Sequence, residues 1–554
     1  MELDVAENEQ ILLVGEANFS FALSLCNHMN PAQITPTCYE NKSDAMKKYK
    51  EEVVVENLRR LNELNCRRIL FEIDACKLEK HFLDEHFDRI IFMFPHVGGK
   101  SNLKKNRQLL SDFFRSAAKV LTNLFDKDTT TMRRACVFVA LAKGQGGTRF
   151  ETDESKRNIK DCWQILNMAQ QNGFILTDCF GFNEDKFDFY KSTGFRSQFK
   201  SFYTSSSLIH KFELSLDLLD TNQTSLVDRF TQFNKYLLES NLNHFSLFTS
   251  KLVSHLKQLK VIEINNSIDQ DQVISDDESS FKNLKIRSSM TQMLAKSNEN
   301  QITVRSGLCL KANRISELAA TKLVESIDFR DLNDLRSYEI LIDYSAATHF
   351  ECELQKTLIE MLTSDTNSIR VAQIDDSSVI FYFNERPPFM SRVNRKNVAY
   401  FLLDVNRILT EMLNLNDSRF LYSNDPRQAL KICETIRNFR FDVKENRVEY
   451  SVESSKWEHD ISFWYEIDKF SMREFLWILL DCSQNQLSTL TLLDTYEREV
   501  TIDANGSMAS MRSHSACYRL TYESTDRALS WESTKKINNR IRDELSKLDF
   551  IELR

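Results

Sequence analysis

Glycine and proline are scarce in this chain of 554 residues, which contains 11 glycines and 6 prolines. Long flexible linkers made of those residues are therefore excluded. The 12 cysteines occur singly, without a Cys-x-x-Cys pair or a Cys/His cluster at zinc spacing. This pattern predicts reduced thiols in an intracellular protein and no metal site.

Long apolar runs are also absent, and none approaches the length of a membrane span, so no membrane partner is expected. The first ten residues, MELDVAENEQ, are acidic and polar, unlike a signal peptide or a mitochondrial transit peptide. We therefore expect a cytoplasmic, nuclear or nucleolar protein that is not secreted. Because the formal net charge is −8, any nucleic acid must be bound by local patches rather than by a broad basic surface.

Strands and helices alternate from residue 11 to about 215. The runs ILLVG, ITPTCYE, RILFEID, RIIFMF, CVFVALA, FILTDCF and SLIHKFEL are typical of strands, whereas 43–64, 105–124 and 156–172 have helical spacing. Nearly all-apolar strands that alternate with helices predict a parallel sheet covered on both faces. The fold class is therefore α/β, with a Rossmann-like domain over residues 1–215.

The rest of the chain divides into three regions by pattern. Residues 216–302 contain two predicted helices and an acidic linker, which includes SIDQDQVISDDESS. Residues 303–454 are mixed α+β, with a predicted hairpin over 369–385 and a predicted helix over 397–415. Residues 455–554 have the order β-α-β-β-α-β of a ferredoxin-like domain.

Three acids of the first domain stand at the carboxyl ends of predicted strands, namely Glu16, Glu40 and Asp74. Ligands of open α/β sheets bind at such ends, where Glu40 can accept hydrogen bonds from ribose hydroxyls and Asp74 can lie beside an adenine edge. The alternative is that each acid only caps the next helix. No G-x-G-x-x-G seat for a pyrophosphate is present, so these residues favour S-adenosylmethionine over NAD.

Four stretches, LLVGEANFSFALSL, FDRIIFMFPHVGGKSN, NRQLLSDFFRSA and LAKGQGGTRFE, resemble the Rossmann-like methyltransferases that modify N3 of a uridine in large-subunit rRNA. The family pattern V-G-E-G-N-F-S-F has glycine where this chain has Ala17. Alanine costs about 1–2 kcal/mol if that position needs a positive φ, and almost nothing otherwise. The resemblance, which covers about residues 10–214, implies that S-adenosylmethionine is bound by Gly15, Glu16, Ala17, Asn18, Phe19, Glu40 and Asp74.

Phe94, Pro95 and His96 follow the fourth predicted strand, where the resemblance and the fold both place the target base. Uracil N3 must lose a proton before it is methylated, so a nearby base or a stabilised uracil anion must help, and His96 is the best-placed titratable residue. The alternative is a histidine that caps the Gly-Gly turn. A base taken out of a duplex can stack on Phe94.

HDISFW, LLDTYE, CYRLTYES and the final FIELR resemble the ferredoxin-fold anticodon-binding domain of phenylalanyl-tRNA synthetases. This resemblance implies contact with tRNA, for which Phe463, Trp464 and Arg519 are candidates. One of the two aromatic residues is expected in the core, because neighbouring strand residues face opposite ways. The RNA-binding candidates of the chain are Lys100, Lys104, Arg196, Trp464 and Arg519.

Residues 397–427 resemble the end of the catalytic core of the same synthetases. The class II pattern G-L-G-L-E-R is replaced here by LLDVNR, from Leu402 to Arg407, so aminoacylation is not expected. The order of the three parts resembles that of ferredoxin-fold anticodon-binding domain-containing proteins. The first hypothesis is an S-adenosylmethionine-dependent methyltransferase of uridine N3 in rRNA or tRNA. The alternative is a non-catalytic scaffold that binds RNA or tRNA.

Overall fold

The computed structural model describes residues 9–98, 102–125, 135–154, 156–193, 204–215, 243–258, 264–268, 302–310, 323–330, 336–345, 369–375, 378–383, 388–395, 398–413, 415, 417–423, 426–438, 453–483, 486–504 and 507–554. The chain forms two compact units. The first unit consists of Met1–Asp217, Glu449–Ser455 and Ser524–Ser533. The second consists of Leu218–Val448, Lys456–Glu523 and Thr534–Arg554.

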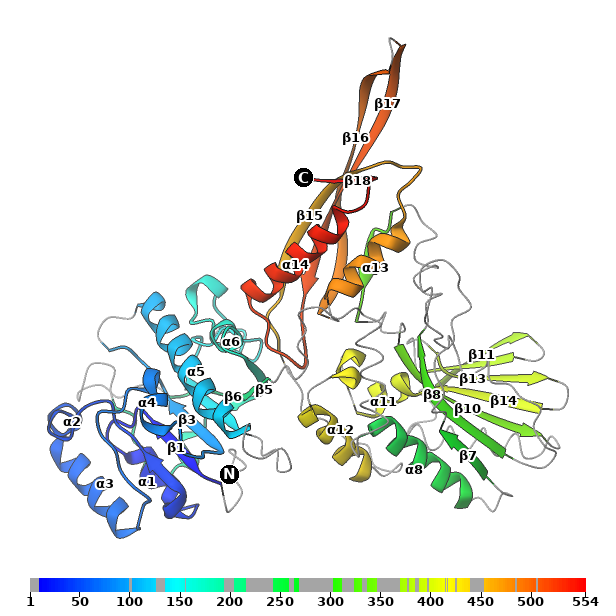
Figure 1. Ribbon diagram of the computed structural model, residues 1–554. Coiled ribbons are helices and arrows are strands. Elements are labelled where there is room, and N and C mark those ends of the chain that lie inside the picture. Colours follow the sequence, from blue (N-terminus) through cyan, green and yellow to red (C-terminus); the bar gives the residue numbers. More distant parts are fainter. Residues whose placement is uncertain are drawn as a thin grey trace. The chain divides into compact units, whose positions relative to one another are not determined.

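The first unit contains a six-stranded sheet in the order β2-β1-β3-β4-β6-β5. Figure 1 labels β1, β3, β5 and β6 of this sheet. Its strands are β1 Ile11–Val14, β2 Ile34–Pro36, β3 Arg89–Met93, β4 Cys136–Leu141, β5 Phe174–Gly181 and β6 Leu208–Leu214. β2, β1, β3 and β4 pair in parallel, as predicted. β6 corrects the expectation of an all-parallel sheet, because it returns between β4 and β5 and is antiparallel to both.

The helices of this unit are α1 Ser20–Cys26, α2 Lys42–Tyr49, α3 Glu51–Glu63, α4 Glu79–Phe82, α5 Leu103–Phe125 and α6 Ile165–Gln170. The predicted helix 43–64 is interrupted at Lys50, whose φ is 66°. The predicted helix 156–172 consists of the 3-10 turn Ile159–Asp161 and α6. The predicted strand 68–74 is wrong except for one parallel bridge between Thr37 and Leu70. The left-handed residue Glu72, with φ 61°, turns the chain out of strand geometry there.

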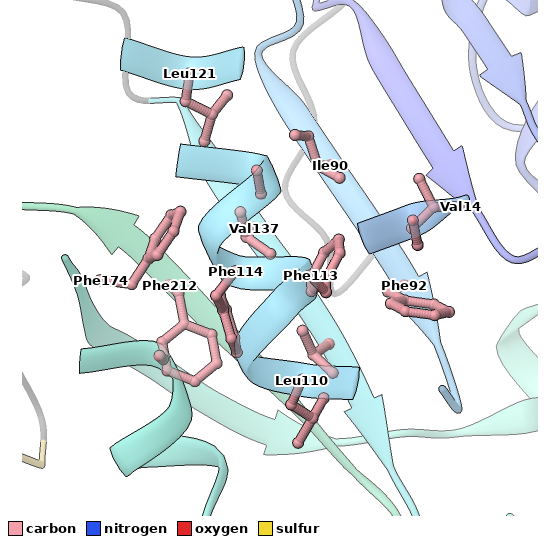
Figure 2. Close-up of a cluster of buried hydrophobic side chains, with 14 of the residues drawn as sticks. Val14, Ile90, Phe92, Leu110, Phe113, Phe114, Leu121, Val137, Phe174 and Phe212 are labelled. Atoms are coloured by element: carbon pink, nitrogen blue, oxygen red, sulfur yellow. The ribbon is translucent and has the colours of Figure 1, made fainter. Parts of the chain in front are cut away.

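Side chains of α5 form the core on one face of this sheet. Leu110, Phe113 and Phe114 repeat at helical spacing and are fully buried. Figure 2 shows these side chains against Val14, Ile90, Phe92 and Val137 of the strands. A second cluster, which includes Leu13, covers the opposite face. The sheet is therefore buried on both faces, as predicted.

Two late segments of the chain complete the first unit. The carboxylate of Glu453 accepts hydrogen bonds from the backbone N–H of Arg149, at 3.0 and 3.2 Å. The backbone N–H of Ala528 donates to Oγ of Ser215 at 3.1 Å. The compact structure around the six-stranded sheet therefore includes residues more than 200 positions beyond its last strand.

The second unit contains a seven-stranded sheet in the order β11-β12-β13-β14-β10-β8-β7. Its elements are α8 His244–Gln258, β7 Ile264–Ile268, β8 Ile302–Leu310, β10 Arg336–Ser345, β11 Ile369–Asp375, β12 Ser378–Phe383, β13 Pro388–Arg395, β14 Val398–Asp404, α11 Val405–Met412, a 3-10 turn Ser418–Tyr422 and α12 Pro426–Asn438. β11 and β12 pair as the predicted hairpin. β7 lies within the expected linker, and the first helix expected in 216–242 lies outside the described residues.

The predicted helix 397–415 is wrong in its first half, which forms β14. This strand pairs with β10 on one side and β13 on the other. Pairing on both edges overrides the helical spacing of its apolar residues. The Asp404 carboxylate then accepts a hydrogen bond from the backbone N–H of Arg407 at 3.2 Å and begins α11.

The second sheet of this unit has the order β18-β15-β17-β16-β9. Its elements are β9 Ser326–Asp328, β15 Trp457–Tyr465, α13 Met472–Ser483, β16 Leu487–Ala504, β17 Ser507–Tyr522, α14 Trp531–Leu545 and β18 Ile551–Leu553. The predicted β-α-β-β-α-β order is confirmed, and all paired strands are antiparallel. β9 adds a strand from upstream in the chain to the free edge of β16.

Candidate functional site

A cavity of about 940 Å³ lies at the carboxyl ends of β1 and β3 in the first unit. The chain runs from β1 outward to β2 and then crosses to β3 on the other side of β1, so the strand order reverses here. Open α/β sheets bind their ligands at such a reversal. The cavity is lined by nine of the residues predicted from the sequence: Gly15, Glu16, Ala17, Asn18, Glu40, Asp74, Phe94, Pro95 and His96.

The first turn of the cavity depends on one glycine. Gly15 has φ +70°, and a β-carbon there would stand 2.5 Å from Cε2 of Phe92. Among the described residues with positive φ, this turn contributes Gly15 and Phe19 but not Ala17. The departure from the family pattern at Ala17 therefore carries no backbone strain. Phe19 is fully buried in the core, 5.4 Å from the ring of Phe71, and does not line the cavity.

Glu16 brings a buried carboxyl group to this cavity. The residue is 6% exposed, and its Oε2 accepts a hydrogen bond from the backbone N–H of Ala22 at 3.2 Å. Burial raises the pKa of Glu16 to about 7, although the Ala22 bond acts in the opposite direction. A positively charged ligand beside Glu16 would favour its ionised form.

Asn18 and Ser20 hold the segment 190–193 at the mouth of the cavity. Nδ2 of Asn18 donates to the carbonyl of Lys191 at 3.1 Å. Ser20 accepts from the backbone N–H of Lys191 and donates to its carbonyl. The Asn18 amide therefore positions a wall of the cavity, a role that the sequence pattern did not indicate. Segment 190–193 itself lines the cavity and was not predicted to do so.

Glu40 lies in the cavity wall with two partners from α2. Its Oε1 forms an ion pair with Lys48 and accepts a hydrogen bond from the hydroxyl of Tyr49 at 3.0 Å. Burial alone would raise the pKa of Glu40, but these two contacts outweigh it and lower the pKa. Glu40 is therefore held ionised, as an acceptor for hydroxyl groups requires.

Asp74 both caps a helical turn and lines the cavity, two roles that the sequence analysis treated as alternatives. It caps the 3-10 turn Ala75–Lys77, because Oδ1 accepts from the backbone N–H of Cys76 at 2.9 Å. It also forms an ion pair with Lys77 at 3.0 Å and lines the cavity. Burial would raise the pKa of Asp74, but the Cys76 and Lys77 contacts outweigh it and lower the pKa.

The segment after β3 forms the other side of the cavity. Phe94 has φ 51°, an unusual value for a bulky residue, and its ring packs edge-on against Phe182 at 5.3 Å. The backbone N–H of Gly98 donates to Nδ1 of His96 at 2.8 Å. His96 thus caps its turn. Because Nδ1 accepts this bond, the proton of the neutral ring lies on Nε2.

Burial lowers the pKa of His96, so the neutral ring is favoured at neutral pH. Its Nε2–H can donate a hydrogen bond, whereas accepting a proton at Nδ1 would break the bond to Gly98. This geometry therefore favours donation by His96 over proton abstraction.

Sequence reasoning did not single out Gln145 and Trp163, which also line the cavity. Gln145 lies in the LAKGQGGTRFE stretch after β4, and its carbonyl accepts from the backbone N–H of Trp163 at 2.7 Å. The ring centroids of Trp163 and His96 are 6.1 Å apart. The position of Gln145 between two glycines, in a loop that follows a strand, was the feature of the sequence that could have indicated it.

None of the RNA-binding candidates that the structure describes, Lys104, Trp464 and Arg519, lines this cavity. Lys104 is exposed at the start of α5, whereas Lys100 and Arg196 lie outside the described residues. In the second unit, Arg519 forms ion pairs with Asp460 at 2.9 Å and with Glu458 at 3.4 Å.

The two aromatic candidates of β15 face opposite ways, as predicted. Phe463 is fully buried in the core, whereas Trp464 is partly exposed. The guanidinium carbons of Arg498 and Arg554 lie 4.0 and 5.3 Å from the ring centroid of Trp464. Tyr496, which is 58% exposed, lies beside the same ring.

Metal ligands and membrane spans were searched for in the described part of the chain. No group of three or more His, Cys, Asp or Glu side chains there could hold a metal ion. No helix there is both long and apolar enough to cross a bilayer.

The first unit has an α/β fold of the Rossmann-like class that methyltransferases share. Residues 12–194 match the family described as "rRNA (uridine-N3-)-methyltransferase BTM5-like". The chain is 35% identical over 266 residues to the Mus musculus "Ferredoxin-fold anticodon-binding domain-containing protein 1 homolog", which covers 45% of this chain and 40% of the relative.

Two further relatives are less similar to this chain. The chain is 26% identical over 220 residues to the "25S rRNA (uridine(2634)-N(3))-methyltransferase" of Saccharomyces cerevisiae, covering 33% of this chain and 65% of the relative. It is 26% identical over 159 residues to the "Phenylalanine--tRNA ligase, chloroplastic/mitochondrial" of Arabidopsis thaliana, covering 28% and 33%. Each match spans less than two thirds of the relative. The resemblances predicted from the sequence are confirmed.

Proposed function

We propose that this chain is an S-adenosylmethionine-dependent RNA methyltransferase that acts at N3 of a uridine in rRNA or tRNA. The observation that carries the proposal is the convergence of Glu16, Glu40 and Asp74 on one cavity beside the glycine turn after β1. The similarity to uridine-N3 methyltransferases supports the same reaction class. Residues 1–215 would form the methyltransferase domain, and 303–454 with 455–554 would present the RNA.

The residues of the cavity fit S-adenosylmethionine. Gly15 allows the left-handed turn to pass close to Phe92 while it lines the cavity. Glu40, held ionised, can accept from ribose hydroxyls, and Asp74 can receive the adenine edge. The Glu16 carboxylate can interact with the positive charge of the cofactor. When bound, the cofactor supplies a methyl group on a positively charged sulfur.

The Phe94–Gly98 side of the cavity would receive the uracil. Loss of the N3 proton leaves negative charge on the two carbonyl oxygens of the base. A donor such as Nε2–H of His96 stabilises that charge without taking up a proton itself. Pro95 is buried and fixes the start of this turn.

Contacts with the RNA backbone would come from Lys100, Lys104 and Arg196 in the first unit. In the second unit, Trp464 offers a stacking surface for a base, whereas Arg519 is neutralised by two acids. An rRNA target would suggest the nucleus or nucleolus, and a tRNA target the cytoplasm.

One observation favours the second candidate, a non-catalytic scaffold that binds RNA or tRNA. Glu40 and Asp74 already have partners within the protein, in Lys48 and in Cys76 with Lys77. Acids with such partners can be retained for stability alone.

Calorimetric titration with S-adenosylmethionine separates the two candidates. We expect micromolar binding by the wild type that is weakened at least tenfold in Glu40→Ala and Asp74→Ala. Tritium transfer to RNA, followed by mass spectrometry of the nucleosides, would then identify N3-methyluridine. Absence of cofactor binding by the folded wild type would contradict the enzyme and favour the scaffold.

A further inference from the structure

Gln145 lies where the loop after β4 meets the cavity. It lines the same cavity as His96 and Trp163. The loop therefore brings one uncharged amide to the side of the cavity that the proposed function assigns to the target base.

The orientation of this amide is determined by one hydrogen bond. Oε1 of Gln145 accepts from the backbone N–H of Ala142 at 3.1 Å. The oxygen is thereby identified, and Nε2 must occupy the other position with two N–H donors. The described residues supply no hydrogen-bond acceptor for Nε2. A flip of the amide would bring Nε2 against the Ala142 N–H, donor against donor.

The loop that carries Gln145 is held from both sides. The buried Glu151 carboxylate accepts from the backbone N–H groups of Gly144 at 2.9 Å and Gly146 at 3.2 Å. The Gln145 carbonyl accepts from the backbone N–H of Trp163. The Gln145 donor is therefore positioned before any ligand binds, so little entropy is lost when it does bind.

A fixed donor discriminates between the two pyrimidines. Uracil carries the acceptor O4 next to N3, whereas cytosine carries the donor N4–H₂ at the same place. O2 is common to both bases and cannot distinguish them. A glutamine that cannot flip presents only a donor at this position, so it can form a hydrogen bond with uracil but not with cytosine.

We propose that Gln145 selects uracil over cytosine by donating a hydrogen bond from Nε2 to O4 of the target base. This inference rests on the proposed function, since it assigns the base to this cavity. As N3 loses its proton, negative charge spreads to O4, and the hydrogen bond from Nε2 of Gln145 to O4 becomes stronger.

Gln145→Glu is the sharpest test. The new carboxylate can still accept from Ala142 with one oxygen, while its second oxygen replaces the donor by an acceptor. The probes are octauridylate and octacytidylate, measured by fluorescence anisotropy with saturating S-adenosylhomocysteine. We expect the wild type to bind octauridylate about tenfold more tightly and Gln145→Glu to prefer octacytidylate. The control Gln171→Glu adds the same charge at an exposed position outside the cavity and should keep the wild-type preference.

Gln145→Met, of similar length and without donor or acceptor, serves if Gln145→Glu does not fold. It should lower the preference to near one by weakening the binding of octauridylate. An unchanged preference in a folded variant overturns the inference but leaves the proposed function intact. A wild type that binds S-adenosylmethionine without preferring octauridylate also overturns the inference alone. A wild type that does not bind S-adenosylmethionine overturns the proposed function.

Discussion

Gly15 and Phe92 are in contact so close that only glycine fits between the two strand ends. A β-carbon at Gly15 would lie 2.5 Å from Cε2 of Phe92, whose ring is in turn 5.0 Å from that of Phe113 in the core. The wall of the cavity and the core below it are therefore one packed structure.

Gly15→Ala is expected to destabilise the fold by about 1–2 kcal/mol because of the φ of +70°. It should also weaken S-adenosylmethionine binding by about tenfold or more, because the clash with Phe92 displaces the turn that lines the cavity. Ala17→Gly is the matched control at the family's second glycine position. Because Ala17 is not left-handed, this change should leave the affinity within about twofold. Calorimetry measures both, and a large gain in Ala17→Gly would mean that alanine does limit the site.

The buried carboxyl of Glu16 predicts a dependence of stability on pH. Its pKa is raised from 4.5 to about 7, so the folded protein binds this proton more tightly than the unfolded chain. The contribution of Glu16 to stability is therefore present below about pH 4.5 and is lost as the pH rises through about 7.

Glu16→Gln should accordingly gain stability relative to the ligand-free wild type as the pH rises from 5 to 8, by about 1–3 kcal/mol. Urea unfolding of both proteins across this range is the measurement. A difference that stays constant with pH would show that the Glu16 pKa is not raised.

Asp74 can be tested separately as a cap and as a ligand. Asp74→Asn keeps a side-chain oxygen for the backbone N–H of Cys76, so its free energy of unfolding should be near that of the wild type. Asp74→Ala should lose about 0.5–2 kcal/mol. If Asp74 also binds the cofactor as a carboxylate, both variants should bind S-adenosylmethionine more weakly. If Asp74→Asn binds S-adenosylmethionine with the wild-type affinity, Asp74 acts only as a cap.

The different surroundings of Trp464 and Arg519 predict an order among the RNA-binding candidates. Trp464→Ala should weaken the binding of a single-stranded oligonucleotide by about 1–3 kcal/mol if a base stacks on the Trp464 ring beside Arg498 and Arg554. Arg519→Ala should have a smaller effect, because Asp460 and Glu458 already neutralise this arginine. Anisotropy at two salt concentrations checks both variants. The reverse order would place the RNA over Arg519.

The sequence correctly predicted those elements in which the spacing of apolar residues agrees with the secondary structure that they form. β1, β3, β4 and α5 carry apolar residues at the period of their final structure. The predictions for 68–74 and 397–415 failed because neighbours decide there: one segment has a left-handed Glu72, and the other pairs on both edges. Local propensity does not contain either fact.

The candidate site shows the same limit. Strand-end positions were sufficient to place Glu16, Glu40 and Asp74 at one cavity. The proton on Nε2 of His96 and the fixed amide of Gln145 each follow from one backbone N–H group, at Gly98 and Ala142. Such bonds depend on the final path of a loop, which spacing in a sequence does not reveal.

The discontinuous first unit has a consequence for synthesis of the chain. A ribosome releases the six strands of its sheet long before it makes Glu453 and Ala528, which bond to Arg149 and Ser215. Nascent domains fold as they emerge, N-terminal parts first. The backbone N–H of Arg149 would therefore lack the Glu453 carboxylate until the C-terminal part of the chain has been translated.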